Sequence, residues 1–348
     1  MRLGLNLGYW TRDEDAVRFA TAEYAEELGL DVVWVAEAHG SDAATVLGHL
    51  TARTRRIGLG SATFRIPGRT PTMTAMTAAT LDGLCGGRFH LGIGLSAPEL
   101  SEGWYGVRFT DPLGRTREYV EILRRTWTQQ LLEYSGTHWT LPLPDGPGKP
   151  QHLALAPQRD RIPIYLGAGG PRNLALTGEI ADGWLGLFPA VDDLPDQIAA
   201  VAAGRAKAGL DLTGFDVAPS LPLVVGPDAA ACADDTRALL APHVGGPGFG
   251  TRNNSYYELA ARLGYEREAA AVRRAWSQER YTDAATALPF GFLDAVALLG
   301  GRDRIAERLA QYAKVGVTTL NVMVRQRGIE QCRAALRVLV EAAESAGM

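Results

Sequence analysis

Short apolar runs alternate with longer amphipathic stretches along almost the whole chain. Most of the short runs are apolar throughout, which is typical of strands that are covered on both faces. The longer stretches carry apolar residues at helical spacing. The predicted strands are 3–7, 31–36, 56–64, 87–95, 162–168, 183–188, 215–225 and 318–324, and the helices that follow them begin near residue 13 and cover 43–54, 70–83, 113–132, 171–181, 192–208, 229–240 and 329–346.

This alternation predicts the fold class. Strands that alternate with helices form parallel sheets with right-handed crossovers, and eight such units are the number that closes a (β/α)8 TIM barrel. An open doubly wound sheet is the alternative. Barrels of this length often form one domain, so residues 1–348 are predicted to be a single α/β barrel with insertions.

Two segments exceed what a barrel needs. Residues 133–161 are rich in proline and glycine and predict a long loop, with a small hairpin at 136–141. Residues 242–292 begin with a glycine-rich stretch and then show helical spacing over 255–263 and 266–280. Long insertions in a compact domain are often lids or binding loops, so this helical segment is predicted to be a lid, with a surface or oligomer contact as the alternative.

Composition excludes several classes of function. Hydrophobic residues make up 46% of the chain and charged residues 21%, and the net charge of −4 gives no basic surface for nucleic acid. The three cysteines are far apart and form no pair with zinc-site spacing. No apolar stretch approaches the roughly 18 residues that span a bilayer, and the start of the chain does not have the pattern of a signal peptide. We expect a soluble cytoplasmic protein with a small-molecule substrate, without metal, membrane or nucleic acid.

The second predicted strand ends in a polar cluster. The run 32–36 is followed by Glu37, His39, Ser41 and Asp42. This cluster fits an ordinary strand-to-helix turn, in which Ser41 or Asp42 caps the next helix. It also fits the rim of an active site, because the functional residues of TIM barrels lie at the carboxyl ends of the strands.

A glycine-rich turn follows the fifth predicted strand. Gly167, Ala168, Gly169 and Gly170 precede a helix that starts at Pro171, and proline is favoured at the first helical position. Glycines let the backbone approach an anion closely, and a helix N-terminus adds free N–H donors. A phosphate is therefore predicted to bind the N–H groups of Gly169, Gly170 and Arg172. The alternative is a tight turn in which glycine only provides a positive φ.

Four segments resemble one known family. Residues 56–88, 86–127, 163–185 and 316–324 are similar to the luciferase-like monooxygenase superfamily, which contains flavin and deazaflavin oxidoreductases, and within it to the F420-dependent branch related to methylene-tetrahydromethanopterin reductase. The resemblance implies a (β/α)8 barrel and coenzyme F420, with FMN as the alternative cofactor. It also implies a homodimer and a partner enzyme that supplies reduced F420 or flavin.

The resemblance also implies roles for individual residues. The peptide between Ala62 and Thr63 would be cis and would back the central ring of the cofactor, while Arg65, like Arg69, would contact its polyanionic tail. Members of this branch often have an acid and then a histidine after the second strand. Glu37 matches the acid, but alanine stands at the usual histidine position and His39 is shifted by one, so the family's proton-transfer residue is in question.

Residues 101–106 follow the fourth predicted strand, on the side where barrel active sites lie. Glu102 is a candidate for proton relay, and Trp104 and Tyr105 are candidates to wall a planar substrate. Trp10, which follows the first predicted strand, is also a candidate for substrate binding. Packing in the core or at an interface is the alternative for these aromatic residues.

Three hypotheses follow. The leading one is an F420-dependent oxidoreductase that transfers a hydride to or from a C=N, C=C or carbonyl group, with Glu37, His39 and Glu102 as candidates for the proton relay. The second is an FMN-dependent monooxygenase that consumes oxygen. The third is a barrel that binds cofactor without turnover, for which the alanine beside Glu37 is the support.

Overall fold

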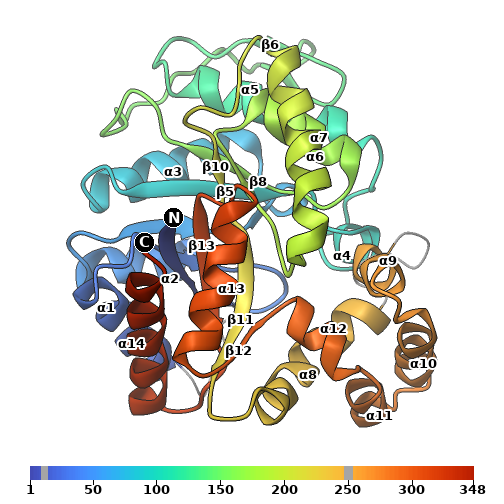
Figure 1. The fold of residues 1–348 in the computed structure, drawn as a ribbon. Helices are drawn as coiled ribbons and strands as arrows, with labels where there is room; N and C mark the ends of the chain where they lie inside the picture. Colours follow the sequence, from blue (N-terminus) through green and yellow to red (C-terminus); the bar gives the residue numbers. More distant parts are fainter. Residues whose placement is uncertain (9–14, 247–253) are drawn as a thin grey trace.

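The structure is a computed structural model that describes residues 1–8, 15–246 and 254–348. Parallel strands form a curled sheet, and helices pack around it (Figure 1). The strands are β1 (Arg2–Asn6), β2 (Val32–Val35), β3 (Gly58–Ser61), β4 (Phe64–Arg65), β5 (Phe89–Gly94), β6 (Tyr134–Ser135), β7 (Thr140–Leu141), β8 (Ile164–Gly167), β9 (Gly183–Leu185), β10 (Asp216–Val217), β11 (Ser220–Val225), β12 (Leu298–Gly300) and β13 (Thr319–Val324).

The α-helices are α1 (Asp15–Glu27), α2 (Ala43–Arg53), α3 (Pro71–Leu84), α4 (Pro98–Gly103), α5 (Pro112–Thr126), α6 (Pro171–Ile180), α7 (Leu194–Lys207), α8 (Ala229–Gly245), α9 (Ser255–Arg262), α10 (Glu266–Ser277), α11 (Tyr281–Thr286), α12 (Phe290–Ala295), α13 (Arg302–Lys314) and α14 (Ile329–Ser345). Two short 3-10 helices, η2 (Ile66–Gly68) and η3 (Val191–Asp193), complete the elements of the described residues.

The strand pairings confirm the barrel. The sheet runs from β10 through β9, β8, β5, β3, β2, β1 and β13 to β11 and β12, and all of these pairs are parallel. The strand order closes into a ring because β10, at one end of it, and β11, near the other end, are two halves of one strand, separated only by Ala218 and Pro219. β10 pairs with β9, and β11 pairs with β13. The eight strands predicted from the apolar runs therefore make up the ring.

Most predicted helix boundaries lie within a few residues of the observed ones, but two barrel elements were not predicted. α13 packs against α14, and the short strand β12 pairs with β11. The predicted helix at 229–240 is the start of α8, which continues to Gly245 with Pro242 inside it. α8 follows the seventh strand of the ring. It also packs against α9, α10, α11 and α12 and is therefore part of the insertion as well.

Both segments that exceed what a barrel needs contain secondary structure of their own. In the first, β6 and β7 form an antiparallel hairpin in which Tyr134 pairs with Leu141. The Glu118 carboxylate of α5 accepts hydrogen bonds from the backbone N–H groups of Thr137, His138 and Trp139, which holds the turn of the hairpin against the barrel. The second insertion contains α9 and α10, close to the two predicted helical stretches.

The second insertion has its own hydrophobic core. The buried side chains of this core come from α8, α9, α10, α11 and α12, and they pack against Phe188, Val224 and Leu299 of the barrel. A bidentate ion pair joins Arg262 of α9 to Asp193 in η3, with the closer contact at 2.9 Å. The insertion is thus packed onto the end of the barrel where β9 stops. None of the helices among the described residues combines the length and hydropathy of a membrane span.

Buried polar side chains occupy part of the barrel interior. The Trp34 indole donates to the Asn321 side chain at 2.9 Å, and the Tyr165 hydroxyl donates to Asp216 at 3.0 Å. His90 packs against the rings of both Trp34 and Tyr165, and its Nδ1 has no hydrogen-bond partner among the described residues. Burial, with a smaller contribution from the charge of Arg159, lowers the pKa of His90 to about 4.

This histidine predicts a pH-dependent stability. In the unfolded chain the pKa of His90 is near 6.5. Below that pH, His90 is protonated in the unfolded state but stays neutral in the folded state until the pH approaches 4. Stability is expected to be full above pH 6.5 and to fall as the pH drops towards 4, with His90 contributing up to about 3 kcal/mol. Urea unfolding at pH 7 and pH 4.5 should show a smaller pH difference for His90→Gln than for the parent protein. An equal difference would contradict the assignment; His243, whose pKa burial also lowers to about 4, titrates in both proteins.

Candidate active site

The predicted site residues gather at the carboxyl ends of four neighbouring strands. β2 leads to Glu37, β3 leads to the Ala62–Thr63 peptide, β5 ends at Gly94, and β8 ends at Gly167. Since β2, β3, β5 and β8 are consecutive in the sheet, these segments share one rim of the barrel. This is the end of a TIM barrel at which functional residues lie.

The peptide between Ala62 and Thr63 is cis, as the resemblance implied. It follows Ser61, whose hydroxyl donates to the carbonyl oxygen of Gly92 at 2.7 Å. The Thr63 side chain fills space that two glycines leave open. A Cβ on Gly94 would collide with the Thr63 hydroxyl, and a Cβ on Gly167 would lie 3.2 Å from its methyl group. The cis segment is thus fitted against the ends of β5 and β8.

The glycine-rich turn leads directly into α6. Gly170 is the N-cap, Pro171 is the first helical residue, and the Ala168 carbonyl accepts a hydrogen bond from the Trp184 indole at 2.8 Å. A Cβ on Gly170 would have no described atom within 4 Å, while one on Gly169 would meet only the Ser255 hydroxyl, at 3.8 Å. The Arg172 side chain is exposed. Among the described residues, the turn therefore presents open space beside a helix N-terminus, an arrangement that suits an anion.

Ser255 is a residue that sequence reasoning missed. It is the first residue of α9, whose N-cap Asn254 accepts hydrogen bonds from the N–H groups of Tyr256 and Tyr257. Helical spacing predicted this helix, but periodicity does not indicate where a helix end lies in space. The start of α9 therefore borders the same turn as the start of α6.

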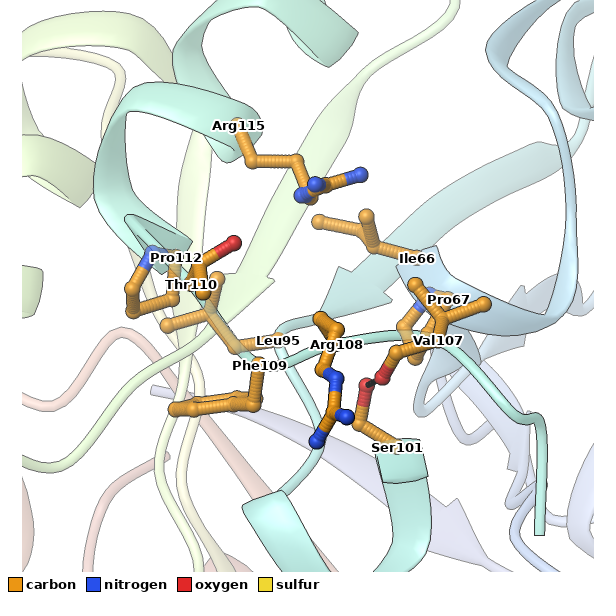
Figure 2. Close-up of a pocket in the computed structure, with 10 residues that line it drawn as sticks. All are labelled: Ile66, Pro67, Leu95, Ser101, Val107, Arg108, Phe109, Thr110, Pro112 and Arg115. Carbon is orange, nitrogen blue, oxygen red and sulfur yellow. Dashed lines mark hydrogen bonds between the residues drawn. The ribbon is translucent and has the colours of Figure 1, made fainter. Parts of the chain in front are cut away.

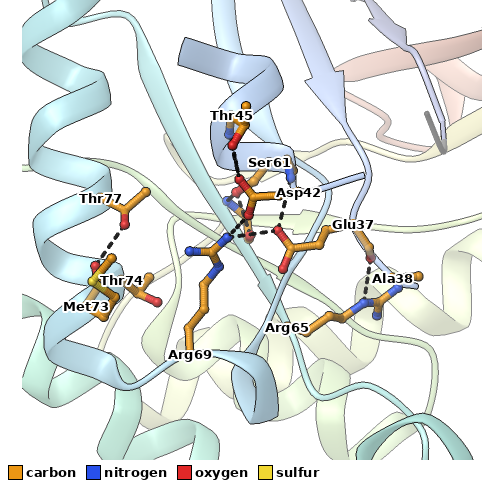
Figure 3. Close-up of polar contacts among 12 residues, drawn as sticks. Glu37, Ala38, Asp42, Thr45, Ser61, Arg65, Arg69, Met73, Thr74 and Thr77 are labelled. Atoms are coloured by element: carbon orange, nitrogen blue, oxygen red, sulfur yellow. Dashed lines mark hydrogen bonds and ion pairs between the residues drawn. The ribbon is translucent and has the colours of Figure 1, made fainter. Parts of the chain in front are cut away.

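Glu37 is buried, with 7% of its surface exposed, and has two polar partners (Figure 3). Its carboxylate accepts from the backbone N–H of Ala43 at 3.2 Å, in the first turn of α2, and from the Arg69 guanidinium at 3.4 Å. Arg69 also pairs with Asp42, which caps α2 by accepting from Thr45. Asp42 is thus the predicted cap. The arrangement keeps Glu37 beside a cation and a helix N-terminus.

Partial burial raises the pKa of Asp42, but hydrogen bonds from Thr45 and the charge of Arg69 outweigh it, so the pKa lies below its ordinary value. Asp42 therefore stays ionised together with Arg69. The cluster of Glu37, Asp42 and Arg69 contains two carboxylates and one guanidinium.

Arg65 and Tyr105 fix the backbone beside Glu37. The Arg65 Nε donates to the Glu37 carbonyl at 2.8 Å, and the Tyr105 hydroxyl donates to the Ala38 carbonyl at 2.9 Å. The Tyr105 ring also lies close to Gly68, where a Cβ would come within 2.7 Å of the ring. Burial, and then the charge of Glu37, raises the pKa of Tyr105. Tyr105 thus acts as an anchor between the segment after α4 and the end of β2.

The remaining candidates are arranged as one pair and one separate residue. His39 is exposed, and its ring meets the Trp104 ring edge-on at a centroid distance of 6.4 Å. Trp104 is 63% exposed. Ala38 is buried whereas His39 is exposed, so the side chains at 38 and 39 point in different directions. Glu102 accepts from the Phe109 backbone N–H at 3.1 Å and contacts Arg108 at 3.5 Å. The predicted substrate residue Trp10 lies outside the described residues.

A shallow pocket lies beside this rim, between η2, α4 and the start of α5 (Figure 2). Its lining includes Ile66, Leu95, Val107 and Phe109, with Arg115 at its edge. The guanidinium of Arg115 is placed 5.4 Å from the centre of the Trp139 ring on the hairpin. Sequence reasoning did not predict this pocket, because the segment 107–112 has no periodicity and its approach to Ile66 is a tertiary contact.

Comparisons with known proteins extend over most of the chain. A family model described as luciferase-like monooxygenase matches residues 14–319. A Mycobacterium tuberculosis protein named as a coenzyme F420-dependent oxidoreductase is 36% identical over 329 residues, which cover 92% of this chain and 94% of that protein. The 5,10-methylenetetrahydromethanopterin reductase of Archaeoglobus fulgidus is 28% identical over 296 residues, which cover 84% and 85%.

A solved structure gives the same fold. Coenzyme F420-dependent tetrahydromethanopterin reductase from Methanopyrus kandleri superimposes with a TM-score of 0.83, covering 99% of this chain and 97% of that one, at 22% sequence identity.

Proposed function

Because the chain belongs to the luciferase-like monooxygenase family, we propose that it is an oxidoreductase that uses coenzyme F420. The substrate is a small organic molecule with a C=N, C=C or carbonyl group that accepts a hydride from the reduced cofactor. In the reverse direction, the reduced product of that transfer is the substrate and gives the hydride to the oxidised cofactor. The observation that carries the proposal is the glycine turn before α6, which leaves open space among the described residues at a helix N-terminus and borders Thr63 at Gly167. The names of the similar proteins support F420 over FMN.

The residues present fit this cofactor. A phosphate at the turn would contact the N–H groups of Gly169, Gly170 and Arg172, since no described side chain fills the space over Gly170. The cis segment would support the ring, and Arg65 lies beside it. F420, when bound, supplies the hydride chemistry, while the protein supplies binding, orientation and a path for the proton.

Among the three proton-relay candidates, we propose His39 as the group that exchanges the proton with substrate. It is exposed at the rim and makes no hydrogen bond to a described residue, so both ring nitrogens are open to a ligand or water. An imidazole accepts a proton when it is neutral and donates one when it is charged. Glu37 is engaged by Arg69 and α2, and Glu102 by the Phe109 backbone, so both hold protein segments in place.

Trp104 and Tyr105 are proposed to wall the substrate, with Trp104 offering the accessible ring and Tyr105 fixing its neighbour in place. The helical insertion is proposed to close the other side, because Ser255 of α9 borders the glycine turn. A separate enzyme that reduces F420 would supply the cofactor, and a homodimer is the proposed assembly.

The proposal predicts the cofactor directly. Titration of the ligand-free protein should show quenching of F420 fluorescence with micromolar affinity and weaker binding of FMN. Reduced F420 mixed with the protein and a panel of imines, enones and ketones should regain the absorbance of the oxidised cofactor with at least one of them. Tight FMN binding without F420 binding, and oxygen consumption with reduced FMN, would contradict the proposal.

Those contradicting results would support the second candidate function, an FMN-dependent monooxygenase. The description of the matching family favours it, because that family is named for monooxygenases. The same glycine turn would then hold the phosphate of FMN.

A further inference from the structure

A groove lies on the outer wall of the barrel between α5, α6 and α7. It is lined by Leu113 and Arg117 of α5, Arg172, Leu176 and Glu179 of α6, and Lys207 at the end of α7. These helices are neighbours in the structure (Figure 1). The groove starts beside the rim of the barrel where substrate is proposed to bind and continues along the outer wall, because its lining comes from the outer helices.

The charges in this groove do not cancel. The Glu179 carboxylate forms a bidentate pair with Arg117, at 2.7 and 2.8 Å. The hydrogen bond from Arg117 lowers the pKa of Glu179, and the charge of Lys207 adds to the effect. Arg172 and Lys207 are both exposed, and neither has a carboxylate within 4.0 Å among the described residues. Two cations are therefore available in a protein whose net charge is −4.

The groove begins at the glycine turn. Arg172 is the second residue of α6, directly after the N-cap Gly170 and Pro171. From Arg172, α6 runs roughly 10 Å to Glu179, at about 1.5 Å per residue. A chain that leaves an anion held at the turn would meet Arg172 first and Lys207 further along. Leu113 and Leu176 provide apolar surface between them for methylene groups.

We infer that this groove binds the polyanionic tail of the cofactor, which is a flexible chain of carboxylates. The inference rests on the proposed function, since it requires the phosphate of F420 at the glycine turn. The chemistry fits because exposed guanidinium and ammonium groups attract carboxylates without a rigid site. A free oligocarboxylate has the same chemistry, so the test must separate the two sources.

The test measures how affinity depends on tail length. Dissociation constants are determined by fluorescence for F420 forms that carry no, two or five glutamates, at low salt. In the parent protein the five-glutamate form should bind about fivefold more tightly than the tail-less form, which is the scale expected for two exposed ionic contacts. Lys207→Glu should abolish this gain and leave the affinity for the tail-less form unchanged.

The matched control is Lys314→Glu. Lys314 is exposed and is the last residue of α13, as Lys207 is of α7, so both variants change the net charge and the helix end in the same way. This variant should keep the full gain with tail length. Free pentaglutamate should compete with the five-glutamate form in the parent protein and leave the tail-less form bound.

Three outcomes would overturn the inference: no gain with tail length in the parent protein, an equal gain in the Lys207 variant, or displacement of the tail-less form by pentaglutamate. Failure of the proposed function has a different signature. In that case the tail-less form itself does not bind, in the parent protein or in either variant.

Discussion

Replacing Arg69 by methionine is expected to lower the free energy of unfolding by about 3 kcal/mol. Glu37 is 7% exposed, and Arg69 is the cation beside its carboxylate. Without the guanidinium, the buried carboxylate keeps only the N–H of Ala43 as a partner among the described residues, and an unpaired buried charge is costly. Asp42 loses the same partner but is exposed, so water compensates for it. Urea unfolding at pH 7 measures the change.

Two further variants identify the cause. In Glu37→Gln/Arg69→Met the side chain at 37 is neutral and still accepts from Ala43, so part of the lost stability should return. Arg65→Met is the matched single change, because Arg65 donates to a backbone carbonyl and pairs with no carboxylate among the described residues, and its cost should be smaller. Equal stability of Arg69→Met and the parent, or no recovery in the double variant, would contradict the role of the ion pair.

Local signals in the sequence predicted most of the fold. The apolar runs identify the eight strands of the ring, because strands covered on both faces have no polar alternation. Helix starts were readable from Asp42, which caps α2, and from prolines at the first position of helices such as α6. α13 was missed although Ile305, Leu309 and Tyr312 are buried at helical spacing. The predicted helix at 229–240 already follows the seventh strand, so the alternation of one helix with each strand does not require a second helix before the eighth strand.

In the candidate site, too, the features set by neighbouring residues were predicted and the features set by long-range contacts were not. The glycine turn was predicted because its geometry depends on consecutive residues, and the cis peptide because the family resemblance located it. The pairing of Glu37 with Arg69 and the approach of Ser255 to Gly169 join residues far apart in the chain. Such contacts depend on how the strands and the insertion pack, and no short-range pattern in one sequence encodes them.

Replacing Gly170 by valine is expected to weaken F420 binding at least tenfold without unfolding the protein. The fold has room for the new side chain, since no described atom lies within 4 Å of a Cβ at this position. That space is where the proposed phosphate contacts the N–H groups at the start of α6, and a branched side chain would displace it. Fluorescence titration with F420 measures the loss of affinity, and thermal unfolding monitors the fold.

Gly301→Val separates loss of the anion site from a general effect on a helix cap. Gly301 is the N-cap of α13, as Gly170 is of α6, and a Cβ there would also meet no described atom within 4 Å. Because valine is a poor N-cap, both variants should lose a similar amount of stability, about 1 kcal/mol. Only the change at Gly170 should affect F420 binding, because the cap at Gly301 has no proposed ligand. If Gly170→Val binds F420 as the parent does, the phosphate does not lie at this turn and the cofactor must be held elsewhere on the rim.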